Sequence, residues 1–151
     1  METAAEQQPI VVGVHGSVAS LAALQWAARE AALRHVTLHV VRAWEDQGRH
    51  LAPYALLRLP GSRESRTAAG VSLEQAVRVM ADKSPPVTVT AEVADGPPAR
   101  VLIDRAVHAA LLVVGSAARD VLGPVTRVCL QRAPCPVVLI SVHRADVLVP
   151  A

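Results

Sequence analysis

The sequence contains almost no aromatic residues. Phenylalanine is absent, and Trp26, Trp44 and Tyr54 make up the whole aromatic content, 2% of 151 residues. Domains that bind single-stranded nucleic acid by stacking need several exposed aromatic side chains. The composition therefore argues against a base-stacking nucleic-acid-binding domain.

An excess of one charge and long apolar runs are missing as well. Fifteen Lys and Arg residues oppose 13 Asp and Glu residues, a formal charge of +2, and Lys83 is the only lysine. So small a charge with scattered arginines predicts no track for nucleic acid. No apolar run approaches the roughly 18 residues of a membrane span. We expect neither nucleic acid nor a membrane as a partner.

Cysteine is scarce, with Cys129 and Cys135 only and no Cys-x-x-Cys motif. Two such thiols behind a polar start without a targeting pattern predict reduced, buried cysteines in a cytoplasmic protein. The length suits one domain. We expect it to span residues 9–143, between a disordered N-terminal segment (1–8) and a C-terminal tail (144–151).

Aliphatic residues are abundant, and they alternate between strand and helix patterns. Hydrophobic residues make up 52% of the chain. The patterns predict strands at 10–14, 37–43, 87–93, 111–114 and 136–142, and helices at 17–34, 67–83, 96–109 and 124–132. Strands separated by helices favour right-handed crossovers and a largely parallel sheet. Ligands of such sheets bind beyond the carboxyl ends of the strands, here around residues 15–17, 41–44 and 115–125.

The motifs in this order resemble those of one known family. Val11-Val12-Gly13-Val14-His15-Gly16-Ser17 looks like the opening of a universal stress protein domain, and residues 38–44 resemble that family's second strand. Residues 111–116 resemble its fourth strand, and Ala133-Pro134-Cys135-Pro136-Val137-Val138 matches a further signature. The resemblance covers almost the whole chain and is closest to single-domain actinobacterial members.

The resemblance implies an α/β fold: an open five-stranded parallel sheet in the order 3-2-1-4-5, with helices on both faces. This fold is Rossmann-like, of the adenine nucleotide alpha hydrolase-like type. Members of the family are not established as enzymes, many bind ATP or AMP, and they act in stress responses. They are usually dimers through the last strand, here Pro136, Val137, Val138, Leu139 and Ile140.

The phosphate-binding pattern of the ATP-binding members, Gly-x2-Gly-x9-Gly-Ser, is incomplete in this chain. Gly115-Ser116 begins it, but Ala118 replaces the second glycine and Pro124 replaces the final serine. The loop to Gly123 is also about five residues too short. Glycines let backbone N–H groups approach phosphates, and proline removes such a donor.

Position 15 is a further departure, because His15 stands where the family has an aspartate. Losing two or three charge-assisted bonds at ~1.5–3 kcal/mol each would weaken phosphate binding by several orders of magnitude. The adenine edge, read by backbone atoms at Val40 and Val41, is less affected. The implied pocket comprises His15, Gly16, Val40, Val41, Gly115, Ser116, Ala118, Arg119, Gly123, Pro124 and Val125.

Three functions follow from these residues. The first is a non-enzymatic stress-response domain with a degenerate phosphate loop, acting through dimerisation and through a partner or small ligand. The second is a working ATP- or AMP-binding protein whose phosphates are held by Arg119, Ser116 and the backbone at Gly115 and Gly123. The third, an enzyme, is least favoured, because no Gly-x-Ser-x-Gly elbow or marked triad is present.

No metal site is expected. His35 and His39 are four residues apart, but they flank a predicted strand. Four residues in an extended strand separate side chains by roughly 13 Å, too far for a shared metal ion.

Overall fold

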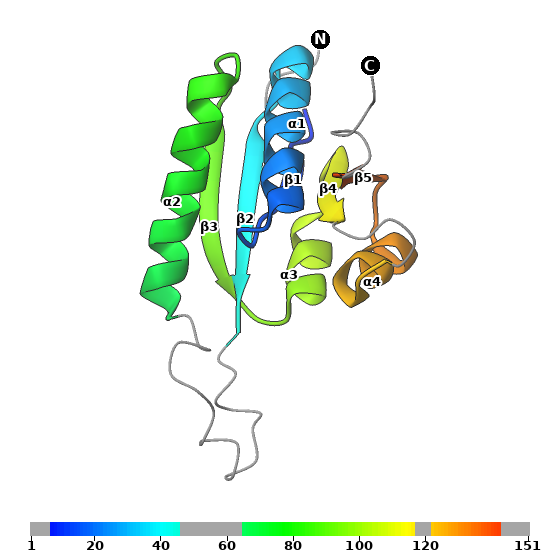
Figure 1. Ribbon diagram of the computed structural model, residues 1–151. Helices are drawn as coiled ribbons and strands as arrows, with labels where there is room; N and C mark the ends of the chain where they lie inside the picture. Colours follow the sequence, from blue (N-terminus) through cyan, green and yellow to red (C-terminus); the bar gives the residue numbers. More distant parts are fainter. Residues whose placement is uncertain (1–6, 46–64, 117–121, 143–151) are drawn as a thin grey trace, which may run out of the picture.

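Five parallel strands form a single sheet in the order β3-β2-β1-β4-β5 (Figure 1). The computed structural model describes residues 7–45, 65–116 and 122–142. The strands are β1 (Ile10–Gly13), β2 (Leu38–Trp44), β3 (Val89–Asp95), β4 (Leu111–Ser116) and β5 (Val137–Ser141). The predicted strand order and parallel arrangement are confirmed.

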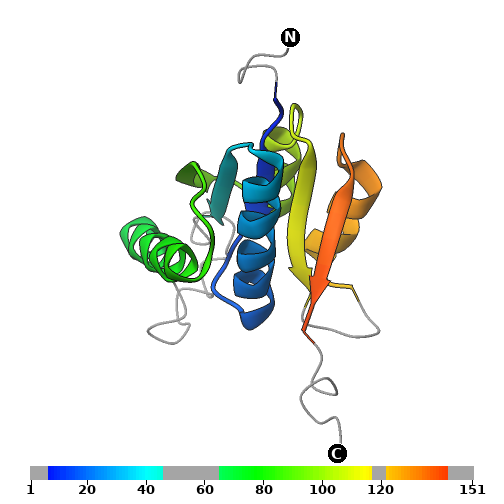
Figure 2. The same ribbon diagram turned by 90° about the horizontal axis from the view of Figure 1, so that it is seen from above.

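Four helices cover the two faces of this sheet: α1 (Val18–Arg34), α2 (Arg66–Lys83), α3 (Pro98–Arg105) and α4 (Pro124–Arg132). Helices α1 and α2 lie on one face, and α3 and α4 lie on the other (Figure 2). Alternate residues of a strand serve opposite faces, so Val12 packs under α1 whereas Val11 packs under α3 and α4. Both side chains are fully buried.

Local signals explain where the helices begin and end. The Ser17 side chain accepts a hydrogen bond from the Ser20 N–H and caps α1, which ends at His35 in the left-handed conformation. The third helix was expected to reach residue 109, but α3 ends at Arg105. Ala106 caps it, with its backbone N–H donating to the Leu102 and Ile103 carbonyls, and the chain turns at residues 106–108.

Strands β2 and β3 lie on one side of β1, and β4 and β5 lie on the other, so the strand order changes direction between β1 and β4. β1 pairs with β2 on one side and with β4 on the other. The carboxyl ends of these strands therefore form the switch point at which open α/β sheets bind ligands. Among the described helices, none is both long and apolar enough to cross a membrane.

Candidate functional site

A cavity of about 290 Å³ opens at this switch point. It lies over the carboxyl ends of β1, β2 and β4 and between the first turns of α3 and α4. Its lining residues are Gly13, Val14, His15, Val41, Ala43, Pro98, Leu102, Val114, Gly115, Val125 and Thr126. Of these, only His15 and Thr126 carry polar side chains, so the cavity suits a flat apolar group with polar edges.

One wall of the cavity is made by α3, which lies unusually close to β1. A Cβ atom at Gly13 would fall 2.8 Å from Leu102 Cδ1. The absence of a side chain at Gly13 thus lets Leu102 reach the sheet. Leu102 is 5% exposed, and both residues line the cavity.

On the opposite face of the sheet, close packing against α1 explains why position 115 is a glycine. A Cβ atom at Gly115 would collide with the backbone of α1, lying 2.5 Å from Ala19 C and 2.7 Å from Ser20 N. The sequence interpretation placed Gly115 in a phosphate loop. The structure adds a packing reason, because the first turn of α1 rests directly on the end of β4.

The two helices that begin at the cavity differ from α1 and α2 at their N-termini. Ser17 and Ser65 cap α1 and α2 with their side chains, whereas α3 and α4 begin after Pro97 and Gly123, which have no side-chain acceptor. Uncapped first-turn N–H groups carry partial positive charge and suit an anion. Proline at the first position of both helices removes one donor from each.

His15 lies at the rim of the cavity and is exposed. Its Nε2 atom is 3.3 Å from Ser17 Oγ, and its backbone N–H donates to Ser20 Oγ at 3.3 Å. The next residue, Gly16, has φ +95°, a conformation that favours glycine. The turn therefore holds the imidazole beside the N-terminus of α1.

The structure gathers only part of the predicted pocket around the cavity. His15, Val41, Gly115 and Val125 line it. Val40 is fully buried in the core under α1 and α2, so its side chain points away from the cavity, although the prediction concerned its backbone.

The other predicted pocket residues have different places. Gly16 borders the groove between α1 and α2, and Ser116 is buried without lining the cavity. Gly123 and Pro124 begin α4. Ala118 and Arg119 lie outside the described residues.

Several lining residues were missed from the sequence. Ala43 lies within the region 41–44 expected to bind ligands but was left out of the implied pocket; it follows Val41 on the same face of β2, as the two-residue period of a strand indicates. Pro98 opens the helix that follows β3, which the carboxyl-end rule also favours. Leu102 and Thr126 carry no such signal, because their position depends on how α3 and α4 pack.

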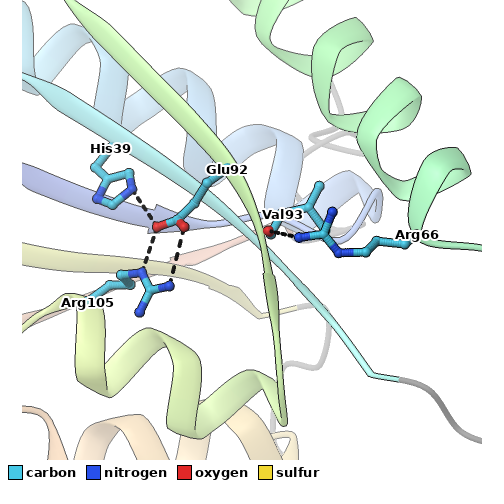
Figure 3. A network of polar contacts seen from close by, with 5 residues as sticks. All are labelled: His39, Arg66, Glu92, Val93 and Arg105. Atoms are coloured by element: carbon cyan, nitrogen blue, oxygen red, sulfur yellow. Dashed lines mark hydrogen bonds and ion pairs between the residues drawn. The ribbon is translucent and has the colours of Figure 1, made fainter.

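A polar cluster on the same face lies outside the cavity lining (Figure 3). Glu92 Oε1 is 2.9 Å from His39 Nε2 and 2.6 Å from Arg105 Nε, and Oε2 is 3.3 Å from a terminal Arg105 nitrogen. Hydrogen bonding to Arg105 holds the pKa of Glu92 below its usual value of 4.5, although burial opposes this. Nearby, Arg66 donates to Asp95 and to the Val93 carbonyl, each at 3.0 Å.

The histidines and cysteines form no metal cluster in the part of the chain that the structure describes. His35 ends α1, and His39 instead contacts Glu92. Cys129 is buried and Cys135 half-buried, both as free thiols. Burial raises the pKa of both thiols, which disfavours the reactive thiolate.

The fold and the cavity together define an open α/β domain with a cavity at its switch point. The profile of the Universal stress protein family matches residues 7–141, and the chain belongs to this family. A universal stress protein of Mycolicibacterium smegmatis is 36% identical over 135 residues, which cover 83% of this chain and 43% of that protein. The chain thus spans about half the length of such curated relatives.

Solved structures of the family share the architecture. A universal stress protein in complex with cAMP superposes with TM-score 0.68 at 24% identity, covering 89% of this chain and 97% of the other. The universal stress protein of Archaeoglobus fulgidus in complex with dAMP gives TM-score 0.65 at 25% identity, with coverages of 88% and 97%.

Proposed function

We propose that this chain is a non-enzymatic stress-response domain that binds an adenine nucleoside monophosphate weakly and pairs with a second copy of itself. The cavity at the switch point carries this proposal. Its apolar walls suit a purine, and the first turns of α3 and α4 present N–H groups to a single phosphate. The family relative from Archaeoglobus fulgidus, whose structure contains dAMP, supports this ligand class.

The phosphate side of the pocket argues against a triphosphate. Pro98 and Pro124 each remove a donor at the helix N-termini, and Ala118 replaces a glycine of the family pattern. The cavity of about 290 Å³ is at the small end of ligand pockets. A ligand with one phosphate makes the fewest demands on this loop.

The domain is proposed to be non-enzymatic because the cavity lining offers little catalytic chemistry. His15 and Thr126 are the polar side chains among the described lining residues, and no carboxylate accompanies them. A general base needs a neighbouring group that orients it. Within the described residues, the His15 imidazole makes one side-chain contact, with the capping hydroxyl of Ser17.

The two edges of the sheet support pairing through β5. The β3 edge carries Glu92 and Asp95, and charges on an edge strand discourage pairing. The β5 edge, Val137–Ser141, has no charged residue. Pairing two copies through β5 would cover this unprotected edge.

Calorimetric titration of the purified protein with AMP, cAMP and ATP–Mg²⁺ tests the ligand. We expect AMP to bind with a Kd near or above about 10 μM and ATP–Mg²⁺ to bind no more tightly. Ala43→Phe fills the cavity and should abolish binding, whereas Ala91→Phe, at an exposed position of β3, should not. If ATP instead binds with a micromolar or lower Kd and more tightly than AMP, the phosphate loop works, and Arg119 is the residue expected to pair with the phosphates.

Sedimentation equilibrium tests the dimer. Ser141→Lys adds a charge to an exposed position of β5, and Thr90→Lys adds the same charge to an exposed position of β3. We expect Ser141→Lys alone to weaken self-association. A wild-type monomer at micromolar concentration, or equal effects of both lysines, would remove the proposed β5 interface.

A further inference from the structure

We propose that Glu92 is a positioning residue for the ligand pocket, acting through Arg105 to hold α3 where Leu102 and Pro98 form the pocket wall. The inference rests on the proposed ligand pocket. Glu92 does not line the cavity, but Arg105 connects it to α3, whose Pro98 and Leu102 do.

The geometry of the contact is a fork rather than a single ion pair. Both Glu92 carboxylate oxygens accept from Arg105, at 2.6 Å and 3.3 Å (Figure 3). A two-point contact fixes orientation as well as distance. His39 on β2 approaches Glu92 Oε1 at 2.9 Å, so the carboxylate is held from two sides.

Helix α3 otherwise packs on the sheet through apolar side chains, and Ala106 directly after it is buried in the same core. The helix contains eight residues, of which Val101 and Leu102 are buried, and its N-cap residue Pro97 makes no side-chain cap. Leu102 and Arg105 are three residues apart, which places them on one side of the helix. The same side of α3 therefore carries the pocket wall and the arginine.

The two anchors of that side lie at different places on the sheet. Leu102 rests on Gly13 of β1, near the centre of the sheet. Arg105 reaches Glu92 on β3, two strands away at the edge. Helix α3 thus spans β2 between an apolar anchor and a charged one, and losing the charged anchor removes the polar restraint on its β3 side.

A set of four variants tests this positioning role: Glu92→Gln, Arg105→Gln, the double variant, and Glu30→Gln as a control. Glu30 pairs with Arg34 on α1 at 2.9 Å, away from the pocket. We expect the first three to weaken AMP binding alike, by about two- to fivefold, since an exposed pair is individually weak. Glu30→Gln should leave the affinity unchanged.

Hydrogen exchange measured without any ligand separates positioning from general loss of stability. In Glu92→Gln, amides of α3 should exchange faster while those of α1 keep the wild-type rate. Arg105→Lys keeps the charge beside Glu92 and should recover part of the α3 protection that Arg105→Gln loses.

Unchanged α3 exchange in Glu92→Gln, faster exchange in all helices alike, or additive effects in the double variant would each overturn the proposal. If the wild-type protein binds no nucleotide, the proposed function fails, but the exchange measurement still decides whether Glu92 holds α3.

Discussion

Replacing Gly115 by alanine tests how closely α1 packs on the sheet. The added Cβ would lie 2.5 Å from Ala19 C and 2.7 Å from Ser20 N. These atoms are helix backbone, and Ala19 and Ser20 are themselves buried, so no flexible side chain can move aside. The first turn of α1 must shift away from β4.

The size of the effect follows from two opposing contributions. Overpacking a core costs about 1–3 kcal/mol, and a collision with backbone belongs at the upper end of this range. Alanine restricts the unfolded chain and returns about 0.4–1 kcal/mol. We expect Gly115→Ala to lower the free energy of unfolding by about 2–3 kcal/mol, which lowers the Tm by roughly 5–10 °C at this chain length.

Urea unfolding without nucleotide measures this change, and Gly123→Ala is the matched control. A Cβ at Gly123 meets nothing within 4 Å, and its φ of −66° is ordinary for alanine. The control should remain within about 1 kcal/mol of wild type. Equal stabilities for the two variants would refute the packing argument and leave ligand contact as the reason for glycine at position 115.

Three further predictions concern the cavity, the free energy of unfolding at acid pH, and the reactivity of the thiols. Gly13→Ala should push the Leu102 side chain towards the cavity and weaken AMP binding in calorimetry, with a loss of stability under about 2 kcal/mol because a side-chain end can move. The pKa of Glu92 is lowered in the folded state, so its contribution is present above pH 4.5 and lost as pH falls below that value. The free energy of unfolding of Glu92→Gln should therefore differ from wild type by about 1 kcal/mol or less at pH 7, and the difference should vanish as pH falls through the lowered pKa of Glu92. Native protein at pH 7.5 should react slowly with iodoacetamide, Cys135 before the fully buried Cys129, because burial raises the pKa of both thiols; rapid labelling of Cys129 would contradict its burial.

The sheet could be predicted because its strands carry their own signals. Residues 10–12 are β-branched and buried on both faces, as a central parallel strand requires. The strand order came from the family resemblance and is confirmed. The predicted end of α3, at residue 109, lies too far along the chain, because apolar residues continue through Val107 while the backbone already turns at Ala106.

The cavity could be predicted only in part. His15, Val41 and Gly115 follow from the rule that ligands bind at the carboxyl ends of strands. Leu102 and Thr126 belong to helices, and which helical residue faces the sheet depends on packing that no local pattern specifies. The close packing of Gly115 against α1 could not be predicted either, because the backbone of α1 becomes its neighbour only in the folded chain.

The charge of Glu92 links the two halves of the proposed function. On an edge strand it discourages pairing at β3, which leaves the uncharged β5 as the edge available to a second copy. On the face of the sheet the same carboxylate holds Arg105 and with it the wall of the ligand cavity. A neutral residue at this position would give up both effects at once. The β3 edge would keep only the charge of Asp95, so a less protected edge and a loosened α3 should appear together: Glu92→Gln should show both weak self-association through β3 and faster exchange in α3.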